Sequence, residues 1–125
     1  MTKKILLVDD NERIRGGIKE YLEALGYSIT TATDGEDDRR MLFDESLNPD
    51  YVLTDTLMPR INGLKLLQLI HNNGLTSRIK TTLMSQSNRI DDIDLTTYAE
   101  DRNATFLNKD DIDFYKRVIE YFPNN

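Results

Sequence analysis

The chain has 125 residues, of which 38% are hydrophobic, enough for one globular domain with a single core. Sixteen Lys and Arg against twenty-two Asp and Glu give a net charge of −6, which disfavours direct binding to a nucleic-acid backbone or an anionic membrane surface. The chain has no cysteine, which excludes disulfides and thiolate metal sites, and no apolar run approaches the roughly 20 residues of a membrane helix. We therefore expect a single domain over residues 1–125, located in the cytoplasm.

Five short segments have the composition of β-strands. The first is apolar at every position, which is typical of a strand buried on both faces of a sheet. The second alternates weakly and is rich in threonine, and the fourth is less apolar than the first. The predicted strands are 5–8, 27–33, 51–54, 79–84 and 105–107.

Helical spacing of apolar residues fills the intervals between these strands. Gly26 and Asn73-Gly74 are expected to end two of the helices. The weakest helix lies within 88–102, which is rich in Asp and Thr, and Asp110 or Asp111 is expected to cap the last one. The last helix is predicted to bury a stripe of Ile112, Tyr115, Ile119 and Phe122. The predicted helices are 14–25, 34–48, 64–73, part of 88–102, and 112–122.

Strands that alternate with helices indicate an α/β domain with a parallel sheet and right-handed crossovers. In such domains function gathers at the carboxyl ends of the strands. In this chain those ends carry polar residues, namely Asp9, Asp10, Asp55, Ser85 and Lys109.

Three aspartates at one edge of a sheet would repel one another, and a hard cation such as Mg²⁺ relieves that repulsion with oxygen ligands. A carboxylate held at such a site is a plausible nucleophile toward phosphorus. Lys109 and Ser85 would then neutralise charge on the phosphoryl oxygens.

Each residue also has an ordinary structural interpretation. Asp9 and Asp10 resemble the cap of the helix that follows, Asp55 could be a turn residue, and Lys109 could be a solvated surface lysine. The joint pattern favours a site, because every one of these residues falls at the functional edge of the predicted sheet.

Four segments of the chain resemble the receiver domain of two-component response regulators, of the CheY-like kind. They are ILLVDDN at 5–11, DYVLTDTLMPRING at 50–63, LMSQ at 83–86 and FLNK at 106–109. The resemblance covers essentially the whole chain. It implies a flavodoxin-like, doubly wound sheet of five parallel strands in the order 2-1-3-4-5 with five helices, and no output domain within residues 1–125.

The resemblance also implies the role of each residue at the site. Asp55 is the phosphoacceptor, and Asp10, Asp55 and the backbone carbonyl of Leu57 are expected to bind Mg²⁺ directly, with Asp9 helping through water. Ser85 would donate a hydrogen bond to the phosphoryl group and Lys109 would form a salt bridge with it.

The implied output is a switch of the face formed by the last two helices and the strand between them, driven by Ser85 and the aromatic Phe106. The donor would be a histidine kinase or a phosphotransfer protein. The receiver would act on a downstream effector protein or on an output domain outside this chain, as a monomer or a weak dimer that depends on phosphorylation.

The chain departs from the family pattern in three places. Asp110 stands where the family usually has a proline that follows a cis peptide bond. A cis bond before a residue other than proline costs about 2.5–4 kcal/mol, so we predict a trans bond before Asp110. A trans bond could displace Lys109. Gln86 replaces a small residue, and Arg102-Asn103-Ala104 stands where Gly-Ala is usual.

These departures support one alternative function, a pseudo-receiver that binds proteins without being phosphorylated. A phosphohydrolase of the haloacid-dehalogenase type is disfavoured, because it needs Asp-x-Asp where this chain has Asp55-Thr56-Leu57.

Overall fold

We analysed a computed structural model of the chain, which describes residues 2–33, 40–42, 44, 46–56 and 62–124. The helices and strands are β1 (Lys4–Val8), α1 (Glu12–Ala24), β2 (Ser28–Ala32), β3 (Tyr51–Asp55), α3 (Gly63–Asn72), the 3-10 turn η1 (Leu75–Ser77), β4 (Lys80–Ser85), β5 (Arg89–Ile90), β6 (Ile93–Asp94), α4 (Leu95–Glu100), β7 (Thr105–Asn108) and α5 (Phe114–Tyr121). Residues 40–42 are also helical. The start of the helix predicted from residue 34 lies outside the described residues.

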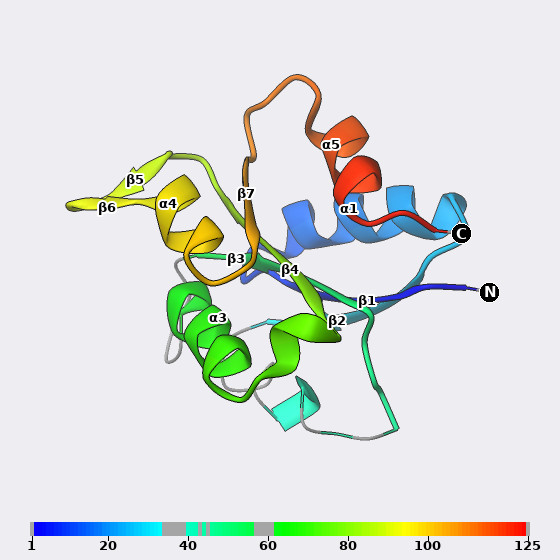
Figure 1. Cartoon of the computed structure of the whole chain (residues 1–125). Helices are drawn as coiled ribbons and strands as arrows, with labels where there is room; N and C mark the ends of the chain where they lie inside the picture. The colour runs from blue at the N-terminus through cyan, green and yellow to red at the C-terminus, as the bar shows by residue number, and fades with distance from the viewer. Residues whose placement is uncertain (1, 34–39, 43, 45, 57–61, 125) are drawn as a thin grey trace.

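The sheet has five parallel strands in the order β2-β1-β3-β4-β7. Helices α1 and α5 cover one face and α3 and α4 cover the other (Figure 1). The predicted doubly wound order and the five helical segments are confirmed, with β7 as the fifth strand of the sheet.

The central strands are apolar because both of their faces are buried. In β1, Ile5 and Leu7 pack toward α1 and α5, whereas Leu6 and Val8 pack with residues of α3. All four side chains are at most 1% exposed. The edge strand β2 is only partly buried, which explains its weak hydrophobic pattern.

Helix α1 begins after Asn11, whose side chain accepts a hydrogen bond from the Ile14 N–H at 3.1 Å. The capping interpretation of Asp9 and Asp10 is therefore wrong, and Asn11 is the cap. At the other end, Gly26 has φ of +95°, a left-handed conformation that favours glycine, and the predicted helix stop is confirmed.

The helix predicted within 88–102 is present, but it is short and follows a hairpin that was not predicted. The segment forms an antiparallel hairpin, β5–β6, followed by the six-residue helix α4. Asp91 takes φ of +52° at the turn, which aspartate tolerates better than most residues, and Ile90 pairs with Ile93 against the α3–α4 core. In Figure 1 the hairpin projects from the side of the domain.

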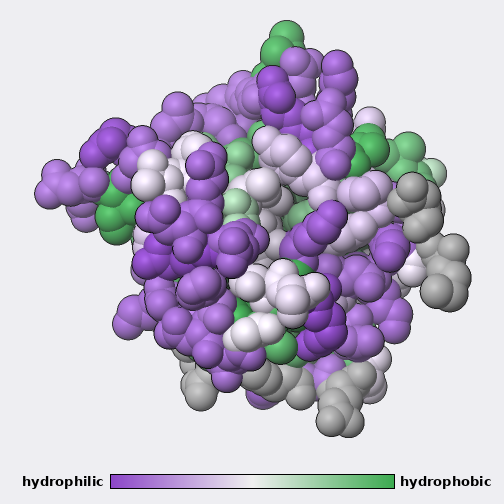
Figure 2. All heavy atoms as spheres, in the orientation of Figure 1, coloured by the Kyte–Doolittle hydropathy of each residue, from purple (hydrophilic) through white to green (hydrophobic). Residues whose placement is uncertain are grey.

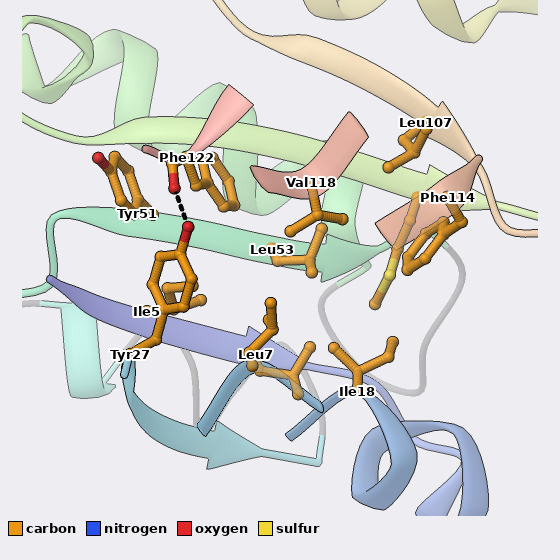
Figure 3. Packing of buried hydrophobic residues seen from close by; sticks show 12 residues of the cluster. Ile5, Leu7, Ile18, Tyr27, Tyr51, Leu53, Leu107, Phe114, Val118 and Phe122 are labelled. Carbon is orange, nitrogen blue, oxygen red and sulfur yellow. Dashed lines mark hydrogen bonds between the residues drawn. The ribbon is translucent and has the colours of Figure 1, made fainter. Parts of the chain in front are cut away.

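The stripe predicted for the last helix is also partly wrong. Helix α5 begins at Phe114, and it buries Phe114, Val118 and the following Phe122 against the sheet (Figure 3). Ile112 lies before the helix and is 98% exposed. Asp113 is at the cap position without a capping side-chain bond, so the predicted caps Asp110 and Asp111 are wrong as well.

The surface is mainly hydrophilic on the face drawn in Figure 2. Among the described residues, the exposed large hydrophobic side chains are Tyr21, Leu25 and Ile112. No helix in the described part of the chain has the length and apolar character needed to cross a membrane.

Candidate functional site

The polar residues singled out in the sequence meet at the carboxyl edge of the sheet. Asp9 directly follows β1, Asp55 ends β3, Ser85 ends β4 and Lys109 follows β7. Since β1, β3, β4 and β7 are successive neighbours in one parallel sheet, their ends converge.

The Lys109 ammonium is the centre of the charged contacts at this edge. Its Nζ lies 2.8 Å from Asp9 Oδ2 and 3.3 Å from Asp55 Oδ2. The three side chains are only 11%, 0% and 14% exposed, so this network is largely removed from water. Among the described residues no peptide bond is cis, so the bond before Asp110 is trans, as predicted, and Lys109 still reaches both carboxylates.

Asp9, Asp10 and Asp55 form the acidic group expected of a magnesium site. One carboxylate oxygen from each lies within 4.8 Å of the others. Asp9 is buried, Asp55 is half-buried and Asp10 is exposed, which leaves one open side. Carboxylate oxygens are hard ligands, so the donor set fits Mg²⁺. Leu57, the fourth expected ligand, lies outside the described residues.

The surroundings of Asp55 raise the pKa of its carboxyl above the usual value. Burial raises the pKa of this carboxyl, Lys109 lowers it through its positive charge, and nearby Asp9 raises it. The Thr56 N–H also donates to Asp55 Oδ1 at 2.9 Å, which holds the carboxylate in one orientation.

Ser85 and Gln86 differ in their exposure. The Ser85 side chain is almost buried, and its Oγ accepts a hydrogen bond from the Ser87 N–H at 3.2 Å. That role as acceptor leaves the hydroxyl proton to donate to another oxygen. Gln86 is exposed to solvent, and its carbonyl accepts from Asn108 Nδ2 at 3.4 Å.

Phe106 lies on β7, where it pairs with Leu83 of β4. It is half-buried and packs against the α3–α4 core. It also lines a hollow of about 510 Å³ between α4, β7 and α5, whose walls include Thr96 and Arg117.

Sequence reasoning missed three groups that hold the acidic residues in position. The Asn11 N–H donates to Asp9 Oδ1 at 2.9 Å, and Arg15 Nη1 donates to the Asp9 carbonyl at 2.7 Å. Gly63 lies against the Asp55 backbone, where an added Cβ would be 2.0 Å from the Asp55 carbonyl oxygen. No spacing in the sequence marks Arg15, because Asp9 lies before α1 and the bond is made to its backbone carbonyl.

Comparison with known families identifies the kind of domain that this chain forms. The sequence pattern of the response regulator receiver domain matches residues 5–113. The chain belongs to the response regulator receiver family. Receiver domains are signalling modules, and the predicted family is therefore confirmed.

Curated relatives of this receiver are longer proteins. It is 39% identical over 72 residues to the Regulator of RpoS of Escherichia coli K12, covering 58% of this chain and 21% of that protein. It is 31% identical over 96 residues to the response regulator MprA of Mycolicibacterium vanbaalenii, covering 75% and 41% respectively. The chain thus spans less than half of these relatives.

Solved structures share the fold along nearly the whole chain. CheY4 of Vibrio cholerae, a chemotaxis response regulator, has a TM-score of 0.81 at 19% identity and covers 97% of this chain and 99% of its own. The CheX–CheY–BeF3–Mg complex from Borrelia burgdorferi has a TM-score of 0.80 at 24% identity, covering 96% of this chain and 89% of that one.

Proposed function

We propose that this receiver accepts a phosphoryl group on Asp55 from a histidine of a kinase or phosphotransfer protein, in a reaction that depends on Mg²⁺. One observation carries the proposal: Asp55 ends a central strand with the Lys109 ammonium 3.3 Å away and with Asp9 and Asp10 carboxylates beside it. The proposal treats residues 1–125 as one receiver domain without an output domain.

In the proposed step, a carboxylate oxygen of Asp55 forms a bond to phosphorus. The bond between phosphorus and the donor imidazole nitrogen breaks, and its electron pair stays on that nitrogen, so the products are an acyl phosphate and a free histidine. The chain catalyses only its own phosphorylation and the later hydrolysis. It is not a general phosphatase.

Asp10, Asp55 and the Leu57 carbonyl would hold Mg²⁺, with Asp9 helping through water, and the ion would supply positive charge to the phosphoryl oxygens. The chain supplies the remaining charge compensation. Lys109 is already directed at Asp55 Oδ2, so its ammonium can follow the phosphoryl group without a large movement.

The signal leaves the site through Ser85 and Phe106. Ser85 moves to donate its hydroxyl proton to the phosphoryl group, and Phe106 changes its packing next to the hollow between α4 and α5. The α4–β7–α5 face then binds a downstream effector or an output domain elsewhere in the protein. This receiver contacts neither nucleic acid nor membrane and is a monomer or a weak phosphorylation-dependent dimer.

The test is the intact mass of the protein after incubation with acetyl phosphate, with Mg²⁺ or with EDTA. We expect one added phosphoryl group with Mg²⁺ only, and none in Asp55→Asn. Asp44→Asn, at an exposed aspartate, is the matched control and should be labelled like the wild type. A folded wild type that takes no label and gives unchanged amide spectra with Mg²⁺ and beryllofluoride would support the pseudo-receiver instead.

A further inference from the structure

Asp110 follows Lys109 and has a backbone N–H, which the proline usual at this position in the family lacks. The Asp110 N–H donates a hydrogen bond to Asn108 Oδ1 at 2.8 Å. Asn108 and Asp110 flank Lys109, so the side chain of one neighbour binds the backbone of the other. This hydrogen bond fixes the turn of the chain at Lys109. In a chain with proline at position 110, the proline ring would restrict the backbone instead.

The Asn108 side chain also binds the loop that follows Ser85. Asn108 Nδ2 donates to Asn88 Oδ1 at 2.8 Å and to the Gln86 carbonyl at 3.4 Å. Asn108 pairs with Ser85 across β4 and β7, and the Lys109 N–H donates to the Ser85 carbonyl at 2.8 Å. One side chain therefore connects the segment after Ser85 with the segment that carries Lys109.

The ammonium of Lys109 depends on this backbone because its side chain is long. Lysine has several rotatable bonds, so holding its ammonium between two carboxylates costs conformational entropy, and a fixed backbone reduces the number of conformations that must be excluded. In this receiver the ammonium is 2.8 Å from Asp9 and 3.3 Å from Asp55, and the side chain is 11% exposed. The amide oxygen of Asn108 binds the residue that follows the lysine, and its amide nitrogen binds the loop after Ser85.

We propose that Asn108 is a positioning residue of the phosphoacceptor site, which holds Lys109 over Asp55 through the Asp110 N–H and ties the loop after Ser85 to it. This inference rests on the proposed function, because its effect is on the phosphorylation of Asp55. It accounts for the retention of the Lys109 contacts in a chain that has aspartate at position 110.

The test is the rate of phosphorylation by acetyl phosphate at saturating Mg²⁺, followed by intact mass, in a double-mutant cycle of Asn108→Ala and Lys109→Ala. We expect Asn108→Ala to slow the reaction about fivefold, the effect of losing about one hydrogen bond. Lys109→Ala should slow it about a hundredfold, as for loss of a charge-stabilising donor. The double variant should match Lys109→Ala within about twofold, because Asn108 acts through the lysine.

Two further variants keep the test decisive. Asn108→Ser retains an oxygen that can accept the Asp110 N–H, so it should recover part of the rate and serves if Asn108→Ala does not fold. Asn72→Ala is the matched control, since the Asn72 amide oxygen contacts Gln68 on α3, and it should react at the wild-type rate.

An unchanged rate in folded Asn108→Ala, or an equal slowing on the Lys109→Ala background, would overturn the inference. Failure of the proposed function is distinct from both results, because the wild type itself would then take no label at Asp55.

Discussion

Replacing Gly63 by alanine tests how tightly α3 lies on the strand that carries Asp55. The added Cβ would be 2.0 Å from the Asp55 carbonyl oxygen, 3.0 Å from the Asp55 carbonyl carbon and 3.1 Å from Thr56 Cα. All three are backbone atoms, so no side chain can turn away, and the start of α3 must move off β3. Overpacking in a core costs about 1–3 kcal/mol and occasionally more, so we expect a loss of about 3 kcal/mol in the free energy of unfolding.

The assay is urea unfolding followed by circular dichroism, with Gly16→Ala as the matched control. A Cβ at Gly16 meets nothing within 4 Å, and alanine is the better helix former by about 0.5–1 kcal/mol, so that variant should be slightly more stable than the wild type. A Gly63→Ala protein whose free energy of unfolding is within about 0.5 kcal/mol of the wild type would refute the reasoning, since such a change is usual for an uncrowded surface position. It would mean that α3 can withdraw from β3 at no cost.

Three further predictions concern the core, the pH dependence and the metal. Val118→Ala should lower the free energy of unfolding by about 2 kcal/mol, because the Val118 side chain is only 1% exposed. Ile112→Ala should leave the free energy of unfolding unchanged, because Ile112 is 98% exposed. Equal effects of the two substitutions in urea unfolding would contradict the packing of α5. Burial raises the pKa of Asp55, so between the ordinary carboxyl pKa and the raised value the folded chain binds more protons than the unfolded chain. In metal-free buffer the wild type should therefore lose stability relative to Asp55→Asn as the pH rises through that window, and a parallel pH profile for the two proteins would argue against it. Mg²⁺ should raise the midpoint of thermal unfolding in the wild type and raise it less in Asp10→Asn, and an equal rise in both would place the ion elsewhere.

The strands of the sheet were predictable from their composition and from their alternation with helical segments, although the edge strand β2 gave the weakest pattern. Five short segments with the composition of strands alternate with helical periods, and β1 is apolar and buried at every position after Lys4. The predicted meeting of Asp9, Asp55 and Lys109 follows from the same reasoning, since the ends of parallel strands lie at one edge.

The hairpin was not predictable from hydrophobic spacing. Ile90 and Ile93 lie three residues apart, which suits a helix as well as a two-residue turn between paired strands. The turn depends on Asp91 at φ of +52°, a conformation that the composition of the segment allows but does not require.

The phase of α5 was missed for a related reason. Ile112 and Phe122 fit one helical stripe, while Phe114, Val118 and Phe122 fit another, and both are apolar. The chain turns after Lys109, because the Asn108 side chain accepts from the Asp110 N–H and the Asn108 carbonyl accepts from the Asp111 N–H. Helix α5 therefore begins only at Phe114, and the stripe of Phe114, Val118 and Phe122 faces the core.

The most direct test of the central claim is to locate the phosphoryl group. After reaction with acetyl phosphate and Mg²⁺, borohydride reduces an aspartyl phosphate to homoserine, and peptide mass mapping finds the modified position. We expect homoserine at position 55 and unmodified Asp9 and Asp10. Homoserine at another aspartate, or none in a folded protein, would contradict it.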